Sequence, residues 1–275
     1  YIWIGGQDGF QLLGTANGTE FYDIEKSNSL YSGNGNPYDL TMYGNTMYYH
    51  QAMAQPDAKE FKKAAIQEFT DHCNKDYWDL IPIDQVPEDH QILDAVWSMK
   101  RKRDIKTRKV IKHKARLNVH GGQQELGETY YETYAAVVNW FTVRLIMLLS
   151  ILNKWKTRQI DFVLAFPQAD IEQDLFMKLP KGLVDGKTRS EYVLKLKKNL
   201  YGQKQAARVW NEHLKNGLFK IGFVPSKIDD CLFYRDNVIF MNYVDDGILC
   251  ATDDQSIDSV IQELRALKFE IEDKG

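Results

Sequence analysis

Apolar residues recur every four positions along residues 58–74, at Phe61, Ala65, Phe69 and Cys73. This spacing predicts an amphipathic helix with one buried face. Asp57 directly precedes the stretch, and an aspartate at that point favours a helix start with Asp57 as the N-cap. A short edge strand is predicted at 78–83, because Pro82 cannot donate a hydrogen bond to a neighbouring strand.

Three further stretches predict helices. Residues 142–154 are apolar nearly all round, which is typical of a buried helix. Residues 206–218 and 256–267 each carry one apolar stripe instead, which predicts two amphipathic helices. The stripes consist of Ala206, Trp210, Leu214 and Leu218 in the first helix and of Ile257, Ile261 and Leu264 in the second.

Strand patterns fill the intervals between these helices. Residues 92–119 predict two strands joined by a turn near 104–107. From residue 157 onward the predicted order is strand, helix, strand, strand, helix, strand. This is the split βαβ, ferredoxin-like order of an α+β fold, with a mostly antiparallel sheet and helices on one face. Its first and third strands are neighbours, so Asp161 is expected to face Asp245 and Asp246 at one edge of the sheet.

The adjacent acids Asp245 and Asp246 lie between the apolar runs 238–241 and 247–251, which predicts a tight hairpin with the pair at its turn. Like charges side by side repel, and a hard divalent cation removes the conflict because it prefers carboxylate oxygens. Together with Asp161, the pair suits two metal ions that catalyse phosphoryl transfer. Two alternatives stay open: Asp-Gly favours turns by itself, and Asp161 is also compatible with a structural carboxylate that points away from Asp245.

Charge is segregated along the chain. The net charge is −3, yet ten Lys and Arg stand against one acid, Asp104, between residues 100 and 116. Residues 251–275 carry seven acids and three bases. A basic stretch this dense favours phosphate groups as partners, although a purely solvated face remains the alternative.

Several functional classes find no support in the sequence. The three cysteines, Cys73, Cys231 and Cys250, are far apart and predict reduced, partly buried thiols of an intracellular protein. His72 beside Cys73 is interpreted as an accident of a helix surface. The longest apolar run, 143–152, is too short to span a membrane. We find no Ser/His/Asp or Cys/His arrangement and no glycine-rich phosphate loop.

Residues 1–50 differ from the rest of the chain. They hold eight of the eighteen glycines and show no helical period, which predicts an irregular linker or the tail of an upstream domain. Ordered structure is expected to begin near residue 55. The chain opens with Tyr1, so we expect it to be part of a longer product.

Several stretches resemble the reverse transcriptase domain of copia-type LTR retrotransposons, part of their Pol polyprotein. They occur in the order of that family: KARLNVHGGQQELGETYYETYAAVV, QIDFVLAFPQADIEQDLFMKLPKGL, LKKNLYGQKQAARVW, GFVPSKIDDCLF, YVDD and KFEIEDKG. The resemblance covers about residues 52–275.

The resemblance implies the fingers and palm of a right-hand polymerase over residues 51–275, with a palm core at about 155–275 and an end before the thumb and RNase H. It implies an RNA-directed DNA polymerase that uses two Mg²⁺ ions, with Mn²⁺ as an alternative. The implied partners are an RNA or DNA template-primer, deoxynucleoside triphosphates, an upstream integrase and a downstream RNase H of the same polyprotein. It further implies no membrane and a location in a cytoplasmic virus-like particle.

The resemblance also assigns site residues. Asp161, Asp245 and Asp246 match the catalytic metal ligands. Phe166 matches the aromatic residue that excludes a ribose 2′-hydroxyl, with plain core packing as the alternative. The other matches to nucleotide-binding positions are Tyr201, Gly202 and Lys204, together with Arg116 at the triphosphate and Lys102 beside it.

The chain departs from the family pattern at several positions outside the proposed metal ligands. These include Gln203, Ala207, His120, Tyr134-Ala135-Ala136 and Pro167-Gln168-Ala169. Several of them lose a Gly or Pro that sets backbone geometry. A second hypothesis is therefore a folded, catalytically inert nucleic-acid-binding remnant of such an element.

Overall fold

The computed structural model describes residues 3–6, 9–12, 46–183 and 186–275. Within the first 50 residues it contains an antiparallel pair of strands, β1 (Trp3–Gly6) and β2 (Gly9–Leu12). Strand β3 (Thr46–Met47) and helix α2 (Tyr49–Met53) follow, so described structure begins before residue 55, earlier than predicted. The remainder of the predicted linker lies outside the described residues, and its assignment stays a prediction.

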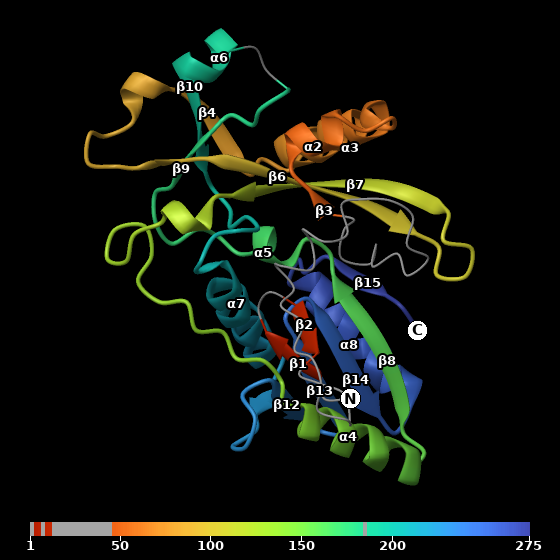
Figure 1. Ribbon diagram of the computed structural model, residues 1–275. Coiled ribbons are helices and arrows are strands. Elements are labelled where there is room, and N and C mark those ends of the chain that lie inside the picture. The colour runs from red at the N-terminus through yellow and green to blue at the C-terminus, as the bar shows by residue number, and fades with distance from the viewer. Residues whose placement is uncertain (1–2, 7–8, 13–45, 184–185) are drawn as a thin grey trace.

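Two small sheets and a long helix form the upper part of the molecule in Figure 1. Strand β3 joins β6 (Ala95–Arg103) and β7 (Val110–Val119), and these two long strands are called the ribbon here. A four-stranded sheet has the order β4-β10-β9-β5. Its strands are β4 (Trp78–Pro82), β5 (Ile92–Leu93), β9 (Phe176–Lys178) and β10 (Tyr192–Leu196), with α6 (Gly186–Glu191) directly before β10. The predicted edge position of β4 and the turn of the ribbon near residues 104–107 are both confirmed.

Helix α3 (Ala58–Asn74) packs against the ribbon and corrects part of the predicted stripe. Phe61 and Ala65 are buried, but Cys73 is exposed and His72 is only 1% exposed. A spacing of four drifts about 40° per step around a helix of 3.6 residues per turn. After three steps Cys73 has left the buried face, whereas His72 lies within about 20° of Phe61. The interpretation of His72 as a surface residue is therefore wrong.

The lower part of the molecule contains a six-stranded sheet of order β11-β12-β13-β14-β8-β15. Its strands are β8 (Lys156–Phe162), β11 (Val224–Pro225), β12 (Leu232–Arg235), β13 (Val238–Tyr243), β14 (Asp246–Ala251) and β15 (Ile271–Asp273). All its neighbouring strands are antiparallel, and β8 pairs with β14 as the ferredoxin-like order requires. The mixed α+β class and the adjacency of the first and third strands are confirmed.

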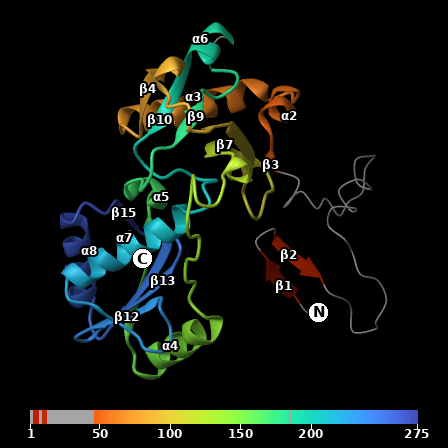
Figure 2. The same cartoon turned by 90° about the vertical axis from the view of Figure 1, so that its left-hand side faces the viewer.

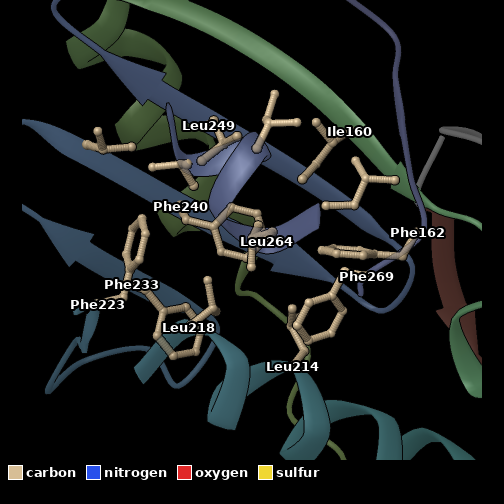
Figure 3. Close-up of a cluster of buried hydrophobic side chains, with 14 of the residues drawn as sticks. Ile160, Phe162, Leu214, Leu218, Phe223, Phe233, Phe240, Leu249, Leu264 and Phe269 are labelled. Atoms are coloured by element: carbon tan, nitrogen blue, oxygen red, sulfur yellow. The ribbon is translucent and has the colours of Figure 1, made fainter. Parts of the chain in front are cut away.

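Helices α7 (Ala206–Lys220) and α8 (Asp254–Ala266) contribute to the main core of this sheet, shown in Figure 3. Both predicted stripes are buried, because each is the only apolar face of its helix. Phe162, Phe240 and Leu249 of the sheet meet Leu214, Leu218 and Leu264 of the helices in this core. Burial of these side chains provides the rigid support on which the end of the sheet rests.

Helix α4 (Trp140–Leu152) corrects two predictions. It packs on the opposite face of the sheet, where Ile146 contacts a second cluster with Met241 and Cys250, so the helices do not lie on one face only. It is also largely exposed rather than buried, with Phe141 72% and Ile151 74% exposed. In a helix that is apolar on all sides, the sequence pattern does not show which side packs against the sheet and which side is exposed. Figure 2 shows α4 at the far end of the molecule from α3, with short helix α5 (Ala165–Gln168) between them.

Candidate active site at the end of the six-stranded sheet

The predicted acidic hairpin is formed by β13 and β14. Tyr243 pairs with Asp246, which leaves Val244 and Asp245 as a two-residue turn. Val244 has φ 57°, a left-handed conformation that is rare for a β-branched residue. Two hydrogen bonds hold this turn: Trp210 Nε1 donates to the Val244 carbonyl at 2.6 Å, and the Phe162 amide donates to the Asp245 carbonyl at 2.8 Å.

The three predicted aspartates meet at the end of neighbouring strands. Asp161 on β8 is directly opposite Asp246 on β14, and residues in direct register extend their side chains from the same face of a sheet. Gly247, directly after Asp246, faces the main core, where a Cβ would lie 2.6 Å from the Phe240 side chain and 3.0 Å from the Ile160 side chain. This register contradicts the alternative in which Asp161 is a structural carboxylate that points away from Asp245.

The three carboxylates also interact electrostatically. Burial raises the pKa of Asp245, and the negative charges of Asp246 and Asp161 raise it further. Arg116 acts in the opposite direction on the same carboxyl group. Gln159 Nε2, a neutral donor, also donates a hydrogen bond to Asp246 Oδ1 at 3.2 Å.

The donor chemistry fits a divalent cation, because three carboxylates supply only hard oxygen ligands. Across residues 46–183 and 186–275, however, no group of three or more His, Cys, Asp or Glu side chains is close enough to hold a metal ion. The aspartates are therefore brought to one place by strand register and by the turn, without forming a finished ligand set.

Two charged residues beside the aspartates were missed by the sequence analysis. Glu272 on β15 lies opposite Asp161, on the other side from Asp246. Lys274 forms an ion pair with Glu272 at 2.5 Å, and this pair, followed by the charges of Asp161 and Asp246, raises the pKa of Lys274. The stretch KFEIEDKG contained both residues, but only the pairing of β15 with β8 shows that they approach Asp161.

Three of the predicted nucleotide-binding residues form a stack next to the aspartates. The Arg116 guanidinium lies 3.8 Å from the centroid of the Tyr201 ring, and the Phe166 ring lies 4.9 Å from the same ring. Burial raises the pKa of Tyr201, and the charges of Asp245 and Asp161 contribute in the same direction while Arg116 opposes them. The stack thus joins the ribbon, through Arg116, to the acidic end of the sheet.

Gly202 occupies a position that excludes any other side chain. Its φ is +92°, and a Cβ there would lie 2.1 Å from the carbonyl oxygen of Val119. The Val119 amide also donates to the Tyr201 carbonyl at 2.9 Å. The absence of a side chain thus lets the loop before α7 lie directly against the end of β7.

Lys204 and Lys102 are placed away from this stack. The Lys204 ammonium donates to the Gln124 carbonyl at 2.9 Å and lies 4.6 Å from the centroid of the Tyr130 ring. Lys102 is exposed near the turn of the ribbon, opposite Lys112. Lys204 therefore fastens the loop after β7, whereas Lys102 belongs to a separate basic surface.

That basic surface is one face of the ribbon. Trp97, Met99, Ala115 and Leu117 of the ribbon are buried with α3. Strand alternation turns the intervening residues to the other face, which includes Lys100, Lys102, Lys112, Lys114 and Arg116. Burial lowers the pKa of Lys114, and the charges of Arg116 and Lys102 lower it further. In Figure 1 the ribbon lies between α3 above and the six-stranded sheet below, so this face is turned toward the sheet.

No helix in the described part of the chain is long and apolar enough to cross a membrane. The three cysteines are free, with Cys231 and Cys250 buried.

Comparison with known proteins confirms the predicted resemblance. Residues 74–275 match a family described as reverse transcriptase (RNA-dependent DNA polymerase). The chain is 34% identical over 200 residues to the retrovirus-related Pol polyprotein from transposon RE1 of Arabidopsis thaliana, covering 71% of this chain and 13% of that protein. It is 30% identical over 234 residues to the corresponding polyprotein from transposon RE2, covering 84% and 15%. The polyprotein from transposon TNT 1-94 of Nicotiana tabacum is 27% identical over 231 residues, covering 82% and 17%. The matched part is thus a small fraction of each relative.

Proposed function

The chain belongs to the reverse transcriptase (RNA-dependent DNA polymerase) family, and from this premise we propose that it is the RNA-directed DNA polymerase domain of a copia-type retrotransposon Pol polyprotein. Its reaction is the extension of a primer on an RNA or DNA template with deoxynucleoside triphosphates. The observation that carries the proposal is the register of Asp161 opposite Asp246, with Asp245 in the adjoining turn.

Asp161, Asp245 and Asp246 would hold Mg²⁺, or Mn²⁺ as an alternative. When bound, two such ions lower the pKa of the primer 3′-hydroxyl and neutralise charge on the triphosphate. The raised pKa of Asp245 supports this assignment, since like charges packed together need a cation to stabilise their ionised form.

The remaining assignments follow from the stack beside the aspartates. Arg116 binds the triphosphate and is oriented by the Tyr201 ring. Phe166 stands against the sugar and excludes a 2′-hydroxyl, supported by its contact with the same ring. Gly202 and Lys204 border the nucleotide and template, and Lys102 with its basic neighbours binds backbone phosphates.

The domain assignment is part of the proposal. Residues 51–275 form the fingers and palm, the palm core covers about 155–275, and the ribbon belongs to the fingers. Residues 1–50 are a linker or the tail of an upstream domain, and the partners within the same polyprotein are an upstream integrase and a downstream RNase H. The site of action is a cytoplasmic virus-like particle.

Primer extension tests the proposal. The protein, a labelled primer on an RNA template, deoxynucleoside triphosphates and Mg²⁺ are expected to yield extended primers, and Asp245→Asn is expected to abolish them. Asp236→Asn is the control, because Asp236 also lies in a two-residue turn of the same sheet, with φ 50°, but is exposed and lies at the opposite end of β13 from Asp245. Equal extension by Asp245→Asn and Asp236→Asn rejects the proposal.

A second candidate function is a catalytically inert nucleic-acid-binding remnant. The lack of a finished three-residue ligand set in the described chain favours it, as do the altered residues around Gln203 and Ala207. It predicts salt-sensitive binding of primed RNA by the basic face of the ribbon with no incorporation of nucleotides by the wild-type protein.

A further inference from the structure

The turn that carries Asp245 has a strained backbone. Val244 has φ 57°, where its branched Cβ is disfavoured. Such a conformation persists only where the surrounding structure holds it in place. Since the turn has only two residues, any relaxation of Val244 rotates the peptide group that leads directly into Asp245.

One buried side chain supplies the restraint. Trp210 is 1% exposed, and its indole N–H donates to the Val244 carbonyl at 2.6 Å. Its ring also packs edge-on against Phe162 at 5.1 Å between centroids. Phe162 directly follows Asp161 and donates its amide to the Asp245 carbonyl at 2.8 Å. Trp210 therefore contacts the residue that follows Asp161 and the residue that precedes Asp245.

The same helix reaches the nucleotide side of the site. Helix α7 begins at Ala206, four residues after Gly202, and Trp210 lies one turn further along. The Tyr201–Gly202 loop at this end of α7 is fixed against β7 by the Val119 amide and by the close approach of Gly202. A shift of α7 thus changes the Arg116–Tyr201 stack and the acidic turn together.

We propose that Trp210 is a positioning residue of the polymerase site. Its indole N–H holds Val244 in the left-handed conformation and thereby aims Asp245 and Asp246 at Asp161. The inference rests on the proposed function for its catalytic consequence, while the coupling between Trp210 and the turn can be measured without catalysis.

The test compares Trp210→Phe, Val244→Gly and the double variant. Phenylalanine keeps an aromatic ring but removes the N–H, so kcat is expected to fall about tenfold, in line with the loss of one buried hydrogen bond, while KM for the template-primer stays unchanged. Glycine adopts the left-handed conformation without strain. Val244→Gly in the Trp210→Phe background is therefore expected to restore kcat to within about threefold of wild type.

Trp97→Phe is the matched control. Trp97 is another buried tryptophan, 3% exposed, whose indole N–H donates to the Lys181 carbonyl at 3.1 Å in the upper part of the molecule. Its loss removes a comparable hydrogen bond in a different sheet from the one that carries the acidic turn. A decrease in kcat for Trp97→Phe as large as that for Trp210→Phe, or a failure of Val244→Gly to restore kcat, overturns the inference.

Hydrogen exchange separates this inference from the proposed function. The Phe162 amide is expected to exchange faster in Trp210→Phe, because its acceptor Asp245 moves, and to regain protection in the double variant. That result, combined with no primer extension by wild type, refutes the polymerase function but supports the coupling of Trp210 to the turn. Unchanged exchange at Phe162 in Trp210→Phe refutes the inference whether or not the protein extends primers.

Discussion

Residues of like charge cluster at two places in this molecule, and the two clusters differ in burial and in how they are held. At the end of the six-stranded sheet, Asp161, Asp245 and Asp246 are half-buried on strands anchored by the main core. On the ribbon, Lys100, Lys102 and Lys112 are exposed on the face of the two long strands that is opposite to α3. The acidic residues are positioned by the turn at Val244 and its hydrogen bonds, whereas each of these lysine side chains is exposed to solvent.

The difference indicates two kinds of binding. Half-buried carboxylates that repel each other are poised for a small cation whose position must be fixed. Exposed cations along a strand attract a polyanion without fixing its register, because each phosphate contact is replaceable. Arg116 belongs to both groups, since it lies on the basic face and also affects the pKa of Asp245. Replacement of one aspartate should therefore nearly abolish activity, whereas replacement of one lysine should weaken binding only slightly.

The largest effect is expected for Asp161→Asn. Loss of one of the three carboxylates proposed to bind the metal ions should lower single-turnover incorporation by about a thousandfold or more. The dissociation constant for primed RNA should change less than about threefold, because the basic face is proposed to supply most of that affinity. Single-turnover extension and equilibrium binding measure the two quantities. If Asp161→Asn lowers incorporation by less than about tenfold, the acidic cluster is not more sensitive to a single substitution than the basic face.

Much of this acidic site could be predicted from local sequence, for a physical reason. Helices α7 and α8 each have one apolar and one polar side, so the sequence pattern alone shows which side faces the core. The short hairpin of β13 and β14 fixes the strand register near Asp246. Asp161 could be paired with Asp246 because the order of elements makes β8 and β14 neighbours.

Contacts between distant segments could not be predicted. Asp57 occupies the N-cap position as expected, but its carboxylate accepts from Arg101 at 2.6 and 2.7 Å and lies 2.6 Å from His113 Nε2, instead of capping the helix. Asp229 accepts from Thr142 Oγ1 at 2.6 Å and from the Asn139 amide at 3.0 Å, and it thereby fixes the start of α4. The partner of Trp210 lies 34 residues away, at Val244. Neither spacing nor composition contains these pairings, which arise only when the sheets assemble.

Phe166→Val should have the second largest effect if Phe166 excludes the 2′-hydroxyl. A smaller side chain leaves room for that group, so the preference for deoxynucleotides over ribonucleotides should fall by roughly 10- to 100-fold. The ratio of kcat/KM values for the two nucleotides measures the preference. Unchanged discrimination would assign Phe166 to packing against Tyr201 alone.

Arg116 tests the point where the two charged groups meet. Arg116→Ala should raise KM for the incoming nucleotide about tenfold, because both a cation and its stacking on Tyr201 are lost. Arg116→Lys keeps the charge but not the planar guanidinium, so its KM should lie between those of wild type and Arg116→Ala. If the lysine variant matches wild type, charge alone is sufficient and the stack does not orient Arg116.

The lysines of the basic face should act gradually and additively. Lys102→Gln and Lys112→Gln are each expected to weaken binding of primed RNA only a few-fold and to reduce the slope of log affinity against log salt by about 0.7–0.9. Fluorescence anisotropy over a range of salt concentrations measures this slope. Lys59→Gln on α3 is the control, since it is exposed on the helix that covers the opposite face of the ribbon. A slope unchanged in both ribbon variants would exclude this face from phosphate binding.

The smallest expected effect is on folding stability: Asp245→Asn should make the protein slightly more stable although it abolishes activity. The folded-state pKa of Asp245 is raised, so its contribution to stability is fully present below the ordinary pKa of an aspartate and is lost as pH rises through the raised value. The side-chain amide of the Asp245→Asn variant does not ionise, so this variant should be more stable than wild type at pH 7, by less than about 1 kcal/mol because the half-buried group is partly screened by solvent. The difference should shrink as pH falls toward the ordinary pKa of an aspartate, about 4. Thermal unfolding at both pH values in EDTA measures it, with Lys102→Gln as the exposed counterpart that leaves stability unchanged. A destabilised Asp245→Asn at pH 7 would show that the acidic turn is not under electrostatic strain.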